Sequence, residues 1–210
     1  MISDKLKIIF VHIPKCCGTT IENLYWPHGK GPSQLYGDFV DKYHNKYQTG
    51  GLQHLTAPLI KEAVGPKFDK YFKFAFVRNP WDRTISQYLY IKKRKDLMSF
   101  IGMKPKFTLE QYLKLIKKKE HVQWMPQHKF VCDENGEFIV DAVGDCSRFK
   151  RDIRAMMALW PPMLKNHNKF PKANQNSTRN PDYKVYYTDA TREMVADFYA
   201  KDISLFQFAY

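Results

Sequence analysis

The chain has 210 residues, of which 44% are hydrophobic and 15% aromatic. That composition suits the packed core of one globular domain, residues 1–210, and excludes a disordered chain. The 34 Lys and Arg residues outnumber the 21 Asp and Glu residues, and the formal net charge of +13 predicts an anionic partner: a nucleotide, an acidic glycan, a nucleic acid or a membrane surface.

The first predicted element is a strand over 8–11, where the run IIFV indicates burial on both faces. Pro14 and Gly18 mark a turn, and a helix is expected to open at Thr19 and Thr20. The stretch that follows, 26–51, has no clear period, and we expect surface loops there.

A helix is expected next, capped by Thr56 and ended by Gly65. The second strand covers 71–77 (YFKFAFV) and leads through a turn into a helix that begins at Trp81. The strand–turn–helix pattern therefore occurs twice, which predicts an α/β fold with both turns at the C-terminal edge of a parallel sheet.

The second half of the chain offers weaker signals. Residues 92–106 are basic and are expected to form a solvated loop, and Thr108 with Gln111 forms a capping box that predicts a helix. The remaining expected elements are a hairpin over 130–141 turning at Asn135-Gly136, a helix over 147–160, a polar surface loop over 165–183, a helix from Thr188, and an apolar tail over 203–210.

The turn after the first strand, PKCCGTT, has the properties of a phosphate cradle. Free N–H groups at a helix N-terminus, together with the helix dipole, favour an anion. Lys15 adds a full positive charge and the Thr hydroxyls add donors. The candidate cradle consists of Lys15, Cys16, Cys17, Gly18, Thr19 and Thr20.

Two other phosphate motifs do not fit this turn. A Walker A loop places Lys directly before Ser or Thr, whereas Lys15 precedes Gly18 by three residues, so magnesium-dependent NTP hydrolysis loses its main support. A cysteine phosphatase needs Arg six residues after its Cys, and those positions here are Glu22 and Asn23.

A second constellation lies in FAFVRNPWDRTISQY. Arg78 ends the strand, and Ser86 falls about a turn and a half into the following helix, on a side that can face Arg78. Arg offers a planar fork to phosphate oxygens, and Ser adds a short hydroxyl donor.

These motifs together resemble the sulfotransferases that use 3′-phosphoadenosine 5′-phosphosulfate (PAPS). PKCCGTT is similar to their 5′-phosphosulfate loop, and 74–88 is similar to their 3′-phosphate element. The segment 186–208 resembles the C-terminal helix of the carbohydrate branch, which includes heparan sulfate 2-O-sulfotransferase-type enzymes. The resemblance is sharp over 8–24 and 74–90, and it implies a P-loop-like α/β domain with a central parallel β-sheet flanked by helices.

The resemblance implies transfer of a sulfuryl group from PAPS to an acceptor hydroxyl, with a carbohydrate as the first choice of acceptor. Lys15 would serve the leaving oxygen, and no metal would be required. His54 is the expected base, since it lies where the 2-O-sulfating branch carries its catalytic His and can titrate near neutrality. Glu22 is the rival base, and a capping or core role for His54 stays open.

Basic residues elsewhere suggest further contacts. The 165–183 loop is a candidate lid, in which Lys172 and Arg179 could reach the nucleotide phosphates and Asn174 or Asn176 its polar edges. Lys92–Lys95 and Lys117–Lys119 could form a track for an acidic glycan, although such runs are more often solvated faces.

Competing functions have less support. A kinase would need a Lys-Ser/Thr pair and a magnesium carboxylate, and a nucleic-acid-binding protein would need a zinc finger, an RRM or a similar motif. No CxxC or HExxH occurs, so no metal is expected. No apolar run approaches the roughly 20 residues of a membrane span and no signal peptide is evident, so a cytoplasmic protein is expected unless this is a trimmed fragment of a Golgi enzyme.

Overall fold

The computed structural model describes residues 1–26, 51–166 and 180–210. It separates into two compact units, which we call the sheet unit (Met1–Val77 and Gln127–Gln175) and the helical unit (Arg78–Pro126 and Asn176–Tyr210). The loops expected at 27–50 and the lid residues Lys172, Asn174, Asn176 and Arg179 lie outside the described residues.

The sheet unit is built on a sheet with the strand order β1-β2-β3-β4. The strands are β1 (Ile2–Ser3), β2 (Ile8–Val11), β3 (Phe72–Val77) and β4 (Ala142–Asp145). β2, β3 and β4 are parallel, with Val11 opposite Ala75 and Val77 opposite Asp145. The predicted central parallel sheet is confirmed, and β1 adds an antiparallel edge strand.

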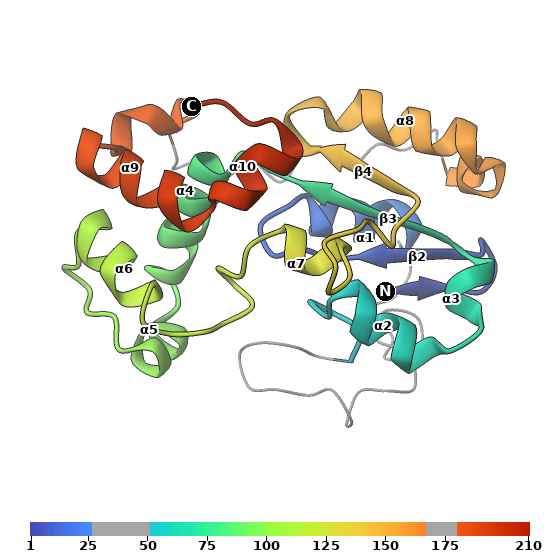
Figure 1. Ribbon diagram of the computed structural model, residues 1–210, viewed down its shortest axis with the longest axis horizontal. Helices are drawn as coiled ribbons and strands as arrows, with labels where there is room; N and C mark the ends of the chain where they lie inside the picture. Colours follow the sequence, from blue (N-terminus) through green and yellow to red (C-terminus); the bar gives the residue numbers. More distant parts are fainter. Residues whose placement is uncertain (27–50, 167–179) are drawn as a thin grey trace. The chain divides into compact units, whose positions relative to one another are not determined.

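Helices cover both faces of this sheet (Figure 1). On one face, α1 (Gly18–Tyr25) and α8 (Phe149–Leu159) pack on alternate residues of β2 and β3. On the other face, α2 (Ala57–Val64) packs against α7 (His128–Val131). Three short elements complete the unit, namely α3 (Lys67–Lys70), η3 (Cys146–Arg148) and η4 (Pro161–Asn166). The fold class is therefore α/β, as expected.

The core of the first face is mostly aromatic along β3. Phe72, Phe74 and Phe76 all turn toward α1 and α8 and are almost completely buried. Gly144 in β4 leaves room for this stack, because a Cβ there would lie 2.6 Å from the Phe76 ring. The small residue in β4 thus allows the sheet to close over a large side chain.

The helical unit contains α4 (Pro80–Ile91), α5 (Lys95–Ile101), α6 (Leu109–Ile116), η5 (Tyr183–Tyr186), α9 (Asp189–Phe198) and α10 (Ala200–Phe206). α4 packs against α5, η5 and α9, and α6 packs against α9. The capping box predicted at Thr108 and Gln111 is present, and Thr188 caps α9 through Thr191 in the same way. No helix in the described ranges is both long and apolar enough to cross a membrane.

Two predicted elements differ from the structure. The expected loop over 92–106 contains α5, whose apolar side (Leu97, Met98 and Ile101) is buried despite the many charges around it. The expected hairpin over 130–141 is shortened to one isolated antiparallel bridge between Cys132 and Phe138, because α7 takes residues 130 and 131. The Asp133 side chain accepts from two backbone N–H groups and closes a compact turn there, so no longer ladder forms.

Candidate functional site

The phosphate-cradle loop lies between β2 and α1 in the sheet unit. Lys15 and Cys17 both have positive φ angles (68° and 60°), which bend the backbone sharply before the helix begins. The Cys16 N–H donates to the Ile13 carbonyl at 3.2 Å and secures the first bend. Cys17 occupies the N-cap position and its side chain makes no cap hydrogen bond to the first turn of α1.

The loop residues differ in how far they reach solvent. Thr19 is exposed and Lys15 and Thr20 are half-buried, so these three side chains can meet a ligand. Cys16 is completely buried, and its thiol contacts the Gln127 Oε1 atom at 3.2 Å. Cys16 therefore contributes to the cradle only through its backbone, while its side chain fixes the loop to the start of α7.

His12 fixes the position of Gly18. A Cβ atom placed on Gly18 would lie 1.8 Å from the His12 Nε2 atom, which is far inside any van der Waals contact. The first residue of α1 must therefore be glycine for the His12 ring to stay where it is. Sequence reasoning missed His12, although a histidine directly after a buried strand and before a phosphate loop was a readable signal.

His12 is also the centre of a small polar cluster. Its Nδ1 atom lies 3.3 Å from the Glu22 Oε1 atom, and both side chains are less than a tenth exposed. The angles do not make this contact a hydrogen bond, and His12 Nδ1 has no other such partner among the described residues. Gln53 donates weakly to the same Glu22 oxygen at 3.5 Å. Glu22, buried within α1, is a partner for His12 and is poorly placed to meet an acceptor.

His54 contacts His12 directly. The two imidazole rings meet edge to face, with centroids 4.7 Å apart. His54 has a positive φ of 62° and lies two residues before Thr56, the N-cap residue of α2, whose side chain makes no capping hydrogen bond. It is half-exposed, in contrast to His12. The structure thus brings His54 and the cradle together through His12, which touches both.

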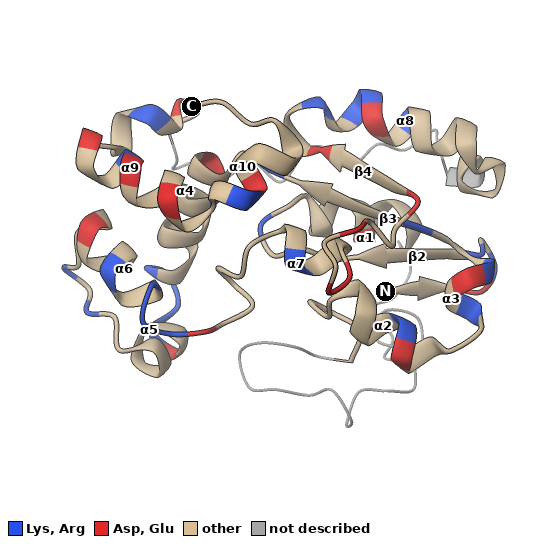
Figure 2. Cartoon of the chain, viewed as in Figure 1, with Lys and Arg blue, Asp and Glu red and all other residues tan. Residues whose placement is uncertain are grey.

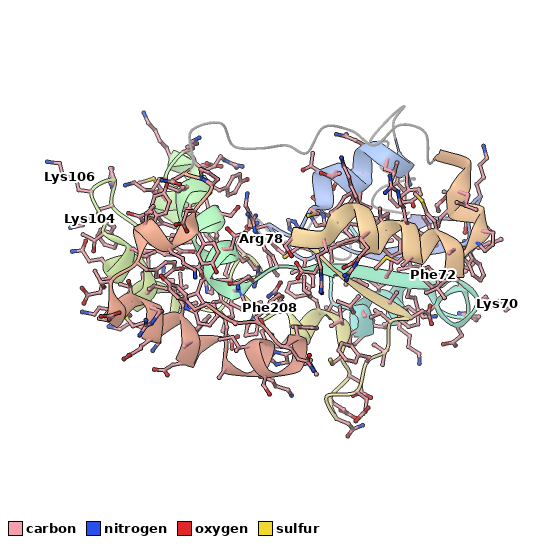
Figure 3. The ribbon with its side chains drawn as sticks, turned by 90° about the horizontal axis from the view of Figure 1, so that it is seen from above. Lys70, Phe72, Arg78, Lys104, Lys106 and Phe208 are labelled. Atoms are coloured by element: carbon pink, nitrogen blue, oxygen red, sulfur yellow. The ribbon has the colours of Figure 1, made fainter. Side chains whose placement is uncertain are left out.

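The second candidate site lies in the helical unit. Arg78 follows β3 in the chain, and its Nε donates to the Asp82 carboxylate in the first turn of α4 at 2.5 Å (Figure 3). Ser86 comes one helical turn after Asp82 on the same side of α4, and all three residues are half-buried. Asp82 therefore orients the guanidinium on the side of the helix that carries the Ser86 hydroxyl.

Among residues 1–26, 51–166 and 180–210, no group of three or more His, Cys, Asp and Glu side chains is arranged to hold a metal ion. Charge at the two candidate sites comes from Lys15, Arg78 and helix termini.

A strand–loop–helix anion cradle at the edge of a parallel sheet defines a P-loop-like protein. A family model described as "Sulfotransferase family" matches residues 1–209 of the chain. The chain belongs to the sulfotransferase family.

Two individual proteins show more limited similarity. A stretch of 40 residues is 48% identical to an uncharacterized protein of Archaeoglobus fulgidus, and it covers 19% of this chain and 33% of the archaeal protein. The chain thus spans about a third of the length of that relative. A crystal structure of a sulfotransferase from Alicyclobacillus acidocaldarius is 13% identical, covering 99% of this chain and 98% of that chain with a TM-score of 0.44.

Proposed function

We propose that the protein is a PAPS-dependent O-sulfotransferase that moves a sulfuryl group to an acceptor hydroxyl by in-line displacement. The observation that supports the proposal is that the His12 ring lies against Gly18 of the loop and also contacts the partly exposed ring of His54. A phosphosulfate group needs such a cradle, and a hydroxyl acceptor needs a base beside it.

The donor is held by both of its phosphate ends. The backbone of residues 17–20 binds the 5′-phosphosulfate, and Lys15 neutralises the negative charge that grows on the leaving oxygen. Arg78 and Ser86 bind the 3′-phosphate, with Asp82 fixing the plane of the guanidinium.

His54 takes the proton of the acceptor hydroxyl. It is preferred over His12 because His12 is only 7% exposed, and over Glu22 because Glu22 is 3% exposed.

The acceptor is a carbohydrate, and an acidic glycan is favoured by the basic segment of the helical unit. Figure 2 shows Lys and Arg residues concentrated on the connections around α5 and α6. Lys92–Lys95 and Lys117–Lys119 are exposed, and Lys104 and Lys106 point away from the body of this unit (Figure 3). A polyanionic chain would find there a run of positive charge.

The first test is binding of 3′-phosphoadenosine 5′-phosphate by calorimetry without magnesium, with Mg-ATP and an oligonucleotide as competing ligands. We expect binding of the bisphosphate alone. Replacing Lys15 by Met should weaken it about 10- to 100-fold, because a charged hydrogen bond is lost. Lys70→Met, on an exposed lysine of α3, is the matched control and should change nothing. Binding of Mg-ATP alone would favour a kinase, and binding of the oligonucleotide alone a nucleic-acid-binding protein.

The second test measures transfer of labelled sulfate from PAPS to a panel of desulfated glycans. His54→Ala should reduce turnover by about 10²-fold or more, the usual contribution of a general base, and leave the affinity for the bisphosphate unchanged. Unchanged turnover in His54→Ala would remove His54 from the role of base.

A further inference from the structure

The last residues of the helical unit fold back onto the start of α4. The tail segment, residues 207–210, begins at Gln207, where a positive φ of 55° ends α10 and turns the chain. Beyond this turn, the Ala209 carbonyl accepts a hydrogen bond from the Asn79 side chain at 2.7 Å. The tail segment is therefore bonded to the residue that directly follows Arg78.

Asn79 connects the tail segment to the first turn of α4 through two different atoms of its amide. The side-chain oxygen accepts from the Trp81 N–H at 3.1 Å and caps the helix, while the amide nitrogen donates to Ala209. Serine caps a helix about as well as asparagine, but its single hydroxyl oxygen cannot replace both amide atoms. The helix cap and the bond to the tail segment can therefore be separated by substitution.

The Tyr210 ring is held by side chains from three other elements. Trp81 of α4 meets it edge to face, with centroids 5.4 Å apart. The Lys184 ammonium of η5 lies 5.0 Å from its centroid and the Arg192 guanidinium of α9 lies 5.5 Å from it, within the range of cation–π attraction. Trp81 is itself fixed, because its indole N–H donates to the Arg192 carbonyl at 2.9 Å. Tyr210 thus anchors the tail segment to α4, η5 and α9 together.

We propose that Asn79 and Tyr210 are positioning residues for the 3′-phosphate site, because they hold the turn that carries Arg78. This inference rests on the proposed function of Arg78. Asp82, which binds the Arg78 guanidinium, lies in the same first turn of α4 that Asn79 caps. A shift of this turn would move Arg78 and Asp82 together. A guanidinium that is already in place loses less conformational freedom when it binds a phosphate, so the tail segment adds affinity without touching the nucleotide.

The experiment compares the binding of two nucleotides by calorimetry. 3′-Phosphoadenosine 5′-phosphate and adenosine 5′-phosphate differ only in the 3′-phosphate, so the ratio of their dissociation constants reports on the Arg78 site. In Asn79→Ser and in Tyr210→Ala, we expect the bisphosphate to bind about three- to tenfold more weakly, with the affinity for adenosine 5′-phosphate unchanged. Tyr210→Phe keeps the ring and should retain the wild-type ratio. Phe100→Ala, which removes an exposed ring of α5, is the matched control and should change neither constant.

Hydrogen exchange of peptides that cover 78–86 gives a second readout, which needs no ligand. Exchange there should become faster in Tyr210→Ala, while α5 and α6 keep their wild-type rates. Tyr210→Phe should behave as the wild type.

Three results would overturn the proposal: an unchanged ratio in both Asn79→Ser and Tyr210→Ala, an equal loss of affinity for the two nucleotides, or faster exchange throughout the helical unit. The last two would indicate a general loss of structure. If the wild type shows no preference for the bisphosphate, the proposed function fails, and the exchange rates alone then decide whether the tail segment holds the turn.

Discussion

His12 connects the features of the cradle to each other. Its ring packs against Gly18 and His54, stacks on Phe10 and approaches Glu22. Two of these contacts, with Gly18 and Glu22, are to α1, so the ring could not move without disturbing the start of α1. Glycine is therefore required at position 18 because a side chain would not fit there. This steric requirement can be tested separately from any requirement for backbone conformational freedom.

Gly18→Ala should destabilise the protein by about 1–3 kcal/mol, because the new methyl group displaces the His12 ring from a filled site. In a His12→Ala background the same change should cost much less, since the obstructing ring is gone. Urea unfolding of the wild type, both single variants and the double variant gives the coupling free energy, which we expect to lie within about 0.5–3 kcal/mol.

A second double-mutant cycle, with Gly144→Ala in place of Gly18→Ala, serves as the control. Gly144→Ala meets Phe76 and not His12, so its effect should add to that of His12→Ala with no coupling. Equal costs of Gly18→Ala in both backgrounds would contradict the steric account of Gly18.

The segment after α6 is held by a buried neutral histidine. His121 is 4% exposed and stacks on Trp124 with centroids 4.7 Å apart. Its Nδ1 atom accepts a hydrogen bond from the Gln123 N–H at 3.1 Å, while its Nε2 atom has no partner among the described residues. Burial lowers the pKa of His121 to about 4 from its usual 6.5. Protonation would remove the acceptor and place a charge in an apolar setting.

This lowered pKa makes stability depend on pH. Above pH 6.5 neither state of His121 carries the proton and the full stability is present. As the pH falls from 6.5 towards 4 the unfolded chain binds the proton and the folded chain does not, so stability is lost, by an amount on the order of 3 kcal/mol. Below about pH 4 both states are protonated and the histidine contributes no further change.

Urea denaturation between pH 7 and pH 4 checks this expectation. His121→Asn keeps an acceptor for the Gln123 N–H and cannot titrate, so its stability should fall less over the window. His128→Asn, at a partly exposed histidine of α7, is the control and should keep the wild-type slope. Identical pH profiles for the wild type and His121→Asn would contradict the attribution of the lost stability to protonation of His121.

Sequence patterns succeeded where the signal was local. The strand over 8–11 and the second strand were found from apolar runs, and the helix starts at Thr108 and Thr188 from capping residues. These signals depend on neighbours within a few residues of each other, which is why one sequence suffices to read them.

The missed features depend on distant partners. β4 is short and only half apolar, and it forms a strand because β3 offers a free edge to residues 142–145. The sequence did not indicate α5, because its many charged residues resemble a solvated loop. Its packing against α4 decides which side of the helix is buried. The contacts of His12 with Glu22 and His54 could not be derived from spacing, because they join a loop, a helix and a segment after 51.

The net charge of the whole chain bears on which acceptor the protein binds. A net charge of +13 should attract any polyanion, but only a local cluster can select one binding path. In the helical unit, Lys117, Lys118 and Lys119 are exposed, and the Lys119 side chain reaches the loop at Gly102 that precedes Lys104 and Lys106. If an acidic glycan binds along this cluster, its KM should rise with salt, because screening weakens each ion contact.

The test substitutes Lys117 and Lys118 together by Ser and measures transfer to an acidic glycan and to a neutral one at 50 and 200 mM salt. For the acidic acceptor we expect KM to rise about three- to tenfold with kcat unchanged, and the salt dependence to become shallower. The neutral acceptor should be unaffected. Lys67 and Lys70 of α3, changed in the same way, remove the same charge from the sheet unit. If that pair raised KM equally, the effect would come from net charge, and the local track around α5 and α6 would be wrong.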